Sequence, residues 1–160
     1  MRKTFAGLLH IQMQLNPDIF MLTADLGFGI LNDIRRDFPN RAYNVGASEQ
    51  LLLGAGIGLA QSGKIPVLYS ITPFLLYRPF EFIRNYVSHE NVPVKLVGSG
   101  RDKDYIHDGI THWADDDENV LSAFPNIIIW KPNSKEELIE TFDSYLYDPS
   151  PVYINLPRSV

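Results

Sequence analysis

Apolar and polar residues follow two periods along this chain, and the two periods alternate. Apolar positions three and four residues apart predict amphipathic helices, whereas short apolar runs between Gly, Pro, Asn and Asp predict buried strands. Helices are expected over residues 4–15, a short segment ending at 36, 48–61, 75–89, 116–123 and 134–147. Strands are expected over residues 19–23, 42–45, 67–70, 94–97, 127–130 and 152–155. This alternation predicts one α/β domain over residues 1–160, with a mainly parallel sheet covered by helices on both faces.

Polar and aromatic side chains follow the ends of the predicted strands. Asp25 comes after the first strand, Glu49 after the second, Phe74 after the third, and Asp108 with His112 after the fourth. Parallel sheets bind ligands beyond the carboxyl ends of their strands. We therefore expect these side chains to gather at one edge of the sheet.

Composition and charge argue against several classes of protein. The chain has no cysteine, which excludes disulfides, thiolate metal sites and cysteine nucleophiles. A formal net charge of -5 with scattered basic residues argues against nucleic-acid binding. No apolar run has the length of a membrane span, and the N-terminal segment lacks the apolar stretch of a signal peptide. We expect a cytoplasmic protein that does not enter the membrane.

A carboxylate at the start of a glycine-rich apolar helix is the first candidate for chemistry. Glu49 precedes the run 51–60, whose small residues allow tight packing. A carboxylate beside such a wall is poorly solvated, so its proton affinity can be raised and it can exchange a proton with a ligand. An acidic residue in a first helical turn also complements the helix dipole, and position alone favours that second interpretation.

Segment 98–113 contains three glycines and no apolar period, which predicts a long functional loop. His112 in this loop can pass protons near neutral pH, with Asp108 close by in sequence. His107 and His112 lack a third ligand, so no metal site is expected. The acidic run 115–118 is expected to be the solvated start of a helix.

Two further segments have both a functional and a structural interpretation. The aromatic residues Phe74 and Tyr77 can stack on a flat ring, although aromatics at helical spacing more often pack in a core. The segment 25–29, Asp-Leu-Gly-Phe-Gly, lacks the third glycine and the lysine of phosphate-binding loops. Asp25 is as readily a turn residue as a ligand-binding one.

Three motifs in register resemble the pyrimidine-binding domain of transketolase and related thiamine diphosphate enzymes. Residues 46–50, Gly-Ala-Ser-Glu-Gln, resemble the acidic motif that precedes a small-residue helix in this family. Residues 108–112, Asp-Gly-Ile-Thr-His, resemble the family's Asp-Gly-Pro-Thr-His loop, and residues 151–158 resemble its last strand. The resemblance covers nearly the whole chain and implies a thiamine diphosphate-binding fold.

The resemblance implies a cofactor and a role for each candidate residue. It implies that Glu49 hydrogen-bonds a nitrogen of the aminopyrimidine ring and so activates thiamine diphosphate for two-carbon (ketol) transfer from a ketose or 2-oxo acid. It further implies that the cofactor is bound by Asp25, Ile71, Phe74 and Tyr77. Asp108 and His112 are implied to contact the substrate, and His112 is also implied to be catalytic. Arg158 is implied to bind a substrate phosphate. The sequence departs from the family at Gly100, where transketolases often carry a histidine, and at Gly29 and His107.

The chain lacks the Gly-Asp-Gly motif with a distant asparagine that holds magnesium and the cofactor diphosphate in this family. The resemblance therefore implies a separate diphosphate-binding subunit that supplies magnesium, in a homodimer of heterodimers. The C-terminal domain that follows the pyrimidine domain in the family is also expected to be missing. Three other functions stay open: a non-catalytic interaction or regulatory module, a component of a deoxyxylulose-phosphate-synthase-like or 2-oxo-acid-decarboxylating enzyme, and a flavodoxin-like nucleotide binder.

Overall fold

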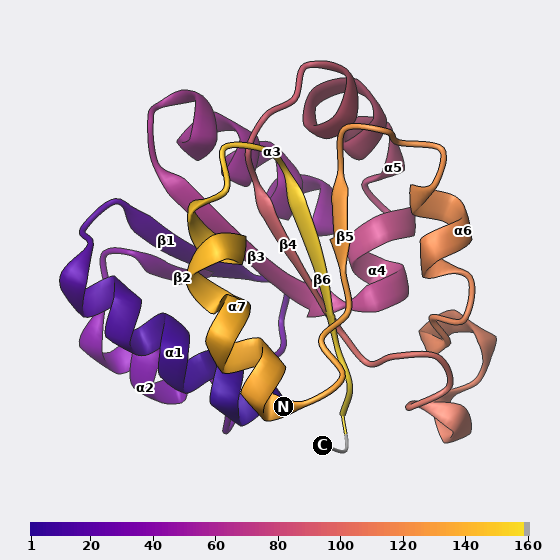
Figure 1. Ribbon diagram of the computed structural model, residues 1–160, viewed down its shortest axis with the longest axis horizontal. Coiled ribbons are helices and arrows are strands. Elements are labelled where there is room, and N and C mark those ends of the chain that lie inside the picture. The colour runs from indigo at the N-terminus through magenta and orange to yellow at the C-terminus, as the bar shows by residue number, and fades with distance from the viewer. Residues whose placement is uncertain (159–160) are drawn as a thin grey trace.

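A six-stranded parallel sheet forms the centre of the computed structural model, which describes residues 1–158 (Figure 1). The strands are β1 (Ile19–Thr23), β2 (Ala42–Asn44), β3 (Ile65–Ile71), β4 (Lys95–Ser99), β5 (Ile128–Trp130) and β6 (Val152–Leu156). Their order across the sheet is β2-β1-β3-β4-β6-β5, and every pair of neighbours is parallel. The predicted α/β class and parallel sheet are confirmed.

Helices cover both faces of the sheet and bury two apolar clusters. One face is covered by α1 (Arg2–Leu15), α2 (Asn32–Asp37) and α7 (Lys135–Tyr147). The other is covered by α3 (Glu49–Gln61), α4 (Thr72–Tyr77), the π-helix η1 (Ile83–His89) and α6 (Asp117–Leu121). Burial on both faces explains the apolar runs of β1, β3 and β6.

The order of the strands indicates where along the sheet edge a ligand can bind. The chain runs from β1 outward to β2, then crosses β1 to form β3 on its other side. Reversal of this kind opens a crevice at the carboxyl ends of the central strands. Gly46, with φ of +76°, makes the turn from β2 into α3, a backbone region in which glycine avoids the strain of a Cβ atom. That turn brings the start of α3 to this edge.

The prediction of one continuous helix over residues 75–89 is wrong. The structure divides it into α4, the short helix α5 (Phe80–Phe82) and η1. Pro79 has no backbone N–H to donate and its ring crowds the preceding turn, so one regular helix cannot pass through it. The break gives α4 an end of its own, next to Arg78.

The acidic run 115–118 is not a uniformly solvated helix start, and that expectation is wrong for Asp117. Its carboxylate is 1% exposed and accepts hydrogen bonds from the Tyr153 hydroxyl at 2.6 Å and the Asn155 amide at 2.8 Å. The Lys131 ammonium lies 3.3 Å away. A buried carboxylate with these partners is part of the packing of the sheet.

The expected loop 98–113 begins inside β4 and contains two 3₁₀ turns, η2 (Ile106–Asp108) and η3 (Ile110–His112). It is held at the sheet edge, where the Gly100 N–H donates to the Leu156 carbonyl at 2.9 Å. The loop therefore lies over the carboxyl ends of β4 and β6. Within residues 1–158, no helix combines the length and apolar character that a bilayer crossing requires.

Candidate functional site

Glu49 is the first residue of α3 and its carboxylate is nearly enclosed. The side chain is 3% exposed, and Oε1 accepts a hydrogen bond from Nη1 of Arg78 at 2.8 Å. The two residues border a cavity of about 350 Å³, which we call the Glu49 hollow; its other lining residues are Ala47, Ser48 and Gln50. The Glu49 carboxylate is buried, as expected, and an open space lies beside it.

A continuous row of side chains leads from Glu49 across the sheet edge. The guanidinium carbon of Arg78 lies 3.6 Å from the ring centroid of Phe74, and Phe74 lies edge-on to His112 with centroids 4.8 Å apart. The His112 ring is 6.0 Å from that of Tyr105, and the guanidinium of Arg158 lies 5.0 Å from the Tyr105 centroid. We call Phe74, His112 and Tyr105 the aromatic row. Two of its members, Phe74 and His112, are residues that the sequence assigned to one site.

The loop residues of the site are held by local turns. The hydroxyl oxygen of Thr111 lies 2.9 Å from Nδ1 of His112, which fixes the orientation of the imidazole. Asp108 is exposed in the preceding turn, where its N–H donates to the Tyr105 carbonyl at 3.0 Å. Gly109, with φ of +79°, separates the two turns. Asp108 and His112 therefore share one short loop beside the row.

Ile71 and Tyr77 bracket α4, the helix that carries Phe74. Ile71 ends β3 and is partly buried, while the Tyr77 hydroxyl donates to the Asp116 carboxylate at the start of α6. Burial, and then the negative charge of Asp116, raises the pKa of Tyr77 above its ordinary value. Tyr77 is thus a neutral hydrogen-bond donor that ties α4 to α6.

Asp25 stands apart from the row among the described contacts. Its backbone, with φ of +50°, donates to the Asn44 side-chain oxygen at 2.9 Å, and its carboxylate lies 3.4 Å from the Asn44 amide nitrogen. Asn44 also accepts from the Gly46 N–H at 3.1 Å. These bonds join the ends of β1 and β2 to the turn before Glu49, as expected for a turn aspartate.

Positive charge gathers at the far end of the row. Arg2, Lys3, Lys135 and Arg158 line a cavity of about 310 Å³ at the starts of α1 and α7. The Arg2 guanidinium lies 3.4 Å from the Tyr105 hydroxyl and 3.4 Å from the Arg158 carbonyl, where the two ends of the chain approach each other (Figure 1). Cations and helix N-termini together favour an anion here.

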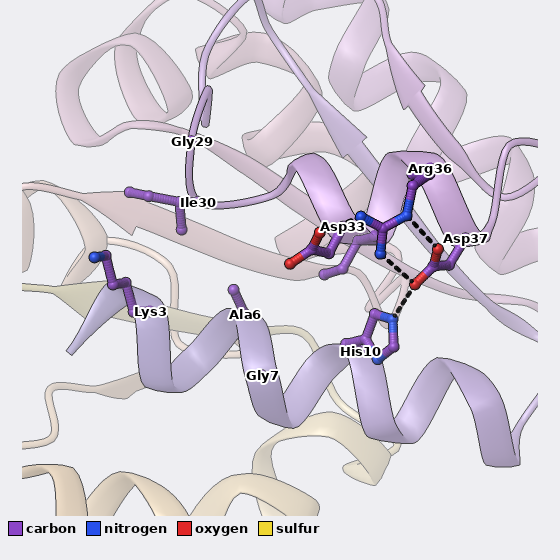
Figure 2. Close-up of a pocket in the computed structure, with 10 residues that line it drawn as sticks. Lys3, Ala6, Gly7, His10, Gly29, Ile30, Asp33, Arg36 and Asp37 are labelled. Atoms are coloured by element: carbon purple, nitrogen blue, oxygen red, sulfur yellow. Dashed lines mark hydrogen bonds and ion pairs between the residues drawn. The ribbon is translucent and has the colours of Figure 1, made fainter.

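A separate polar cavity of about 510 Å³ lies between α1 and α2 (Figure 2). Figure 2 shows Lys3 and Ile30 at one end and His10 with Asp37 at the other. Asp37 accepts from His10 at 2.8 Å and from Arg36 at 2.8 Å, and hydrogen bonds from Arg36 and then His10 lower the pKa of Asp37 to about 2. Asp33 and Asp37 pair with Arg36 and His10, and none of the candidate residues predicted from the sequence lines this cavity, so it is not the candidate site.

The sequence interpretation missed three residues of the site: Arg78, Tyr105 and Arg2. Arg78 lies within the segment singled out for its aromatics, and Tyr105 lies within the predicted functional loop. For Arg2, the only sequence signal was the basic start of the chain. Arg2 reaches the site because the start of α1 lies beside the residues that follow β6. Within residues 1–158, no group of three His, Cys, Asp or Glu side chains is placed to hold a metal ion.

Comparison with known proteins places this geometry in a family. The profile of the family described as "Transketolase, pyrimidine binding domain" matches residues 1–160. The chain is 38% identical over 121 residues to an apulose-4-phosphate transketolase subunit of Actinobacillus succinogenes, covering 76% of this chain and 39% of that protein. It is 30% identical to the putative transketolase C-terminal section of Methanocaldococcus jannaschii, covering 99% of this chain and 50% of that one.

A solved structure shows the same fold. The split gene transketolase described as an inactive beta4 tetramer superposes with a TM-score of 0.87 at 31% identity, covering 99% of this chain and 50% of that chain. The 160 residues thus span half or less of these relatives.

Proposed function

Because the chain belongs to the transketolase family, whose pyrimidine-binding domain it matches along its length, we propose that it is the pyrimidine-binding subunit of a split, thiamine diphosphate-dependent transketolase-like enzyme of the cytoplasm. The observation that carries the proposal is the buried Glu49 carboxylate, which borders a cavity and is joined to the face of Phe74 through Arg78. The proposed reaction is two-carbon (ketol) transfer from a ketose or 2-oxo acid.

The residues around Glu49 fit the pyrimidine end of the cofactor. An aminopyrimidine is a flat ring with polar nitrogens on its edge, so it needs an apolar face and a hydrogen-bonding group in the plane. Phe74 offers the face, and the Glu49 carboxylate offers the polar partner. The hollow of about 350 Å³ has room for one ring. Ile71 and Tyr77 support the ring from the two ends of α4 in this proposal.

When bound, thiamine diphosphate supplies the nucleophilic carbon that takes up the two-carbon unit. Glu49 shares a proton with the ring nitrogen through a carboxylate oxygen, and its burial keeps water from competing for that hydrogen bond. The His112 imidazole, oriented by Thr111, moves a proton at a substrate oxygen, with Asp108 as the neighbouring acceptor. Arg158 binds a substrate phosphate or carboxylate, with Arg2 and Lys135 beside it.

The diphosphate end of the cofactor needs a second chain in this proposal. Magnesium and the diphosphate are held by a separate subunit, and the active site lies between the two. Two copies of each chain form a homodimer of heterodimers. The names of relatives, which describe one as a transketolase subunit and another as a split gene transketolase, support a separate partner subunit.

Reconstitution tests the proposal. The chain is mixed with its diphosphate-binding partner, thiamine diphosphate and magnesium, and ketol transfer is measured from a panel of ketoses and 2-oxo acids. We expect Glu49→Gln to lower the rate by about 10²–10⁴-fold, the usual value of a positioned acid or base. Glu140→Gln, at an exposed position on α7, is the matched control and should keep full activity. Ketol transfer or decarboxylation that does not depend on Glu49 would overturn the proposal.

A further inference from the structure

The ion pair between Glu49 and Arg78 has two unequal partners. The Glu49 side chain is 3% exposed and fixed in the first turn of α3, whereas the Arg78 side chain is 46% exposed and follows the end of α4. Among the described residues, the guanidinium donates one hydrogen bond, to Glu49 at 2.8 Å. Its other contact is the face of Phe74 at 3.6 Å. Arg78 can therefore leave without breaking any other hydrogen bond in this part of the chain.

A guanidinium and an aminopyrimidine offer the same two contacts. Both are flat, delocalised groups that can stack on an aromatic face. The guanidinium donates an N–H to the carboxylate in the plane, and the ring nitrogen does the same when it carries the proton that it shares with Glu49. Arg78 stacks on Phe74 and donates to Glu49 at once. The proposed function assigns those same two contacts to the cofactor ring.

We propose that Arg78 is a further residue of the cofactor site: its guanidinium takes the place of the pyrimidine ring on Phe74 and Glu49, and the ring displaces it on binding. This inference rests on the proposed function. The exchange has a physical basis, because a buried carboxylate with no partner is unstable and Arg78 satisfies it until the ring arrives. Ring binding must then break one ion pair and one cation–π contact, which weakens the affinity of the free subunit.

Titration of the purified 160-residue chain with free methylaminopyrimidine, the ring of the cofactor alone, tests the exchange by NMR. Arg78→Met keeps an apolar side chain on Phe74 and removes the guanidinium. We expect it to bind the ring about tenfold more tightly than the unaltered chain, the factor that matches one lost cation–π contact. Arg84→Met is the matched control, because Arg84 is exposed and its guanidinium donates to the neighbouring Asn85. It should leave ring affinity unchanged.

A second variant keeps the test valid if Arg78→Met fails to fold, which circular dichroism reports. Arg78→Lys keeps a cation for Glu49 but has no flat group to stack on Phe74, so its ring affinity should fall between the other two. Glu49→Gln should weaken ring binding and abolish the gain from Arg78→Met, because the ring and the guanidinium share that carboxylate.

The outcomes separate the two proposals. If Glu49→Gln weakens ring binding but both Arg78 variants bind the ring no more tightly than the unaltered chain, the exchange is refuted and the proposed function stands. If Arg78→Met weakens binding, Arg78 is a direct ligand of the ring and the exchange is again refuted. If no variant binds the ring even with the diphosphate-binding partner present, the proposed function fails, and the exchange that rests on it fails as well.

Discussion

Replacing Asp117 by asparagine removes a charge from the interior without changing the shape of the side chain. The carboxylate is 1% exposed. One oxygen accepts from the Tyr153 hydroxyl at 2.6 Å and the Asn155 amide at 2.8 Å. The other accepts from the Glu118 N–H at 2.7 Å and the Lys131 ammonium at 3.3 Å. All four partners are donors, so the site needs two acceptor oxygens.

An asparagine supplies one acceptor oxygen and one NH₂ group. In either orientation the NH₂ faces two of the four donors, and those two hydrogen bonds are lost. Hydrogen bonds to a charged group contribute about 1.5–3 kcal/mol each, so Asp117→Asn should lower the free energy of unfolding by about 3–6 kcal/mol. For a chain of this size that corresponds to a fall in Tm of roughly 10 °C.

Urea unfolding followed by circular dichroism measures the loss, and Asp115, in the same acidic run, provides the control. The Asp115 carboxylate is 43% exposed and pairs with Lys103 at 3.4 Å on the surface. A surface pair of this kind contributes about 0–1 kcal/mol, so Asp115→Asn should change stability by no more than that. A loss below about 1 kcal/mol for Asp117→Asn, or equal losses for the two variants, would refute the assignment of Asp117 to a buried network.

Two other predictions concern the sheet and its helices. Burial lowers the pKa of Lys95 from 10.5 to about 8, so between these values the unfolded chain binds more protons and stability rises with pH. In urea titrations from pH 7 to 10.5, the free energy of unfolding of the unaltered chain should rise by up to ~3 kcal/mol relative to that of Lys95→Met. If the free energies of the two proteins change with pH in parallel, this prediction is wrong. Within α3, a Cβ at Gly56 would lie 2.6 Å from Leu68 Cδ1, whereas one at Gly58 meets nothing within 4 Å. Gly56→Ala should therefore lower the free energy of unfolding by about 1–3 kcal/mol, and Gly58→Ala should raise it by up to about 1 kcal/mol. Thermal melts in which the two variants shift Tm in the same direction would contradict this packing.

The parts of the fold that were predictable are those governed by local periodicity. The parallel strands carry apolar runs because both faces are buried, and the meeting of Phe74 with His112 at 4.8 Å confirms that side chains after the third and fourth predicted strands converge. The burial of Asp117 was not predictable from its acidic neighbours, because its partners Tyr153 and Asn155 lie on β6. The Glu49–Arg78 pair was not predictable either. The apolar period of residues 75–89 indicated one continuous helix, whereas the helix breaks at Pro79, next to Arg78.

Position 100 shows how one small residue shapes the site. Gly100 has φ of +92°, and a Cβ atom there would clash with the Tyr105 ring. The ring of Tyr105 therefore occupies the space that any side chain at position 100 would need. From that space Tyr105 contacts His112 on one side and Arg158 on the other. The glycine at position 100 and the aromatic row therefore depend on each other, and the row places a phenol between the proposed proton-transfer residue and the cationic end of the site.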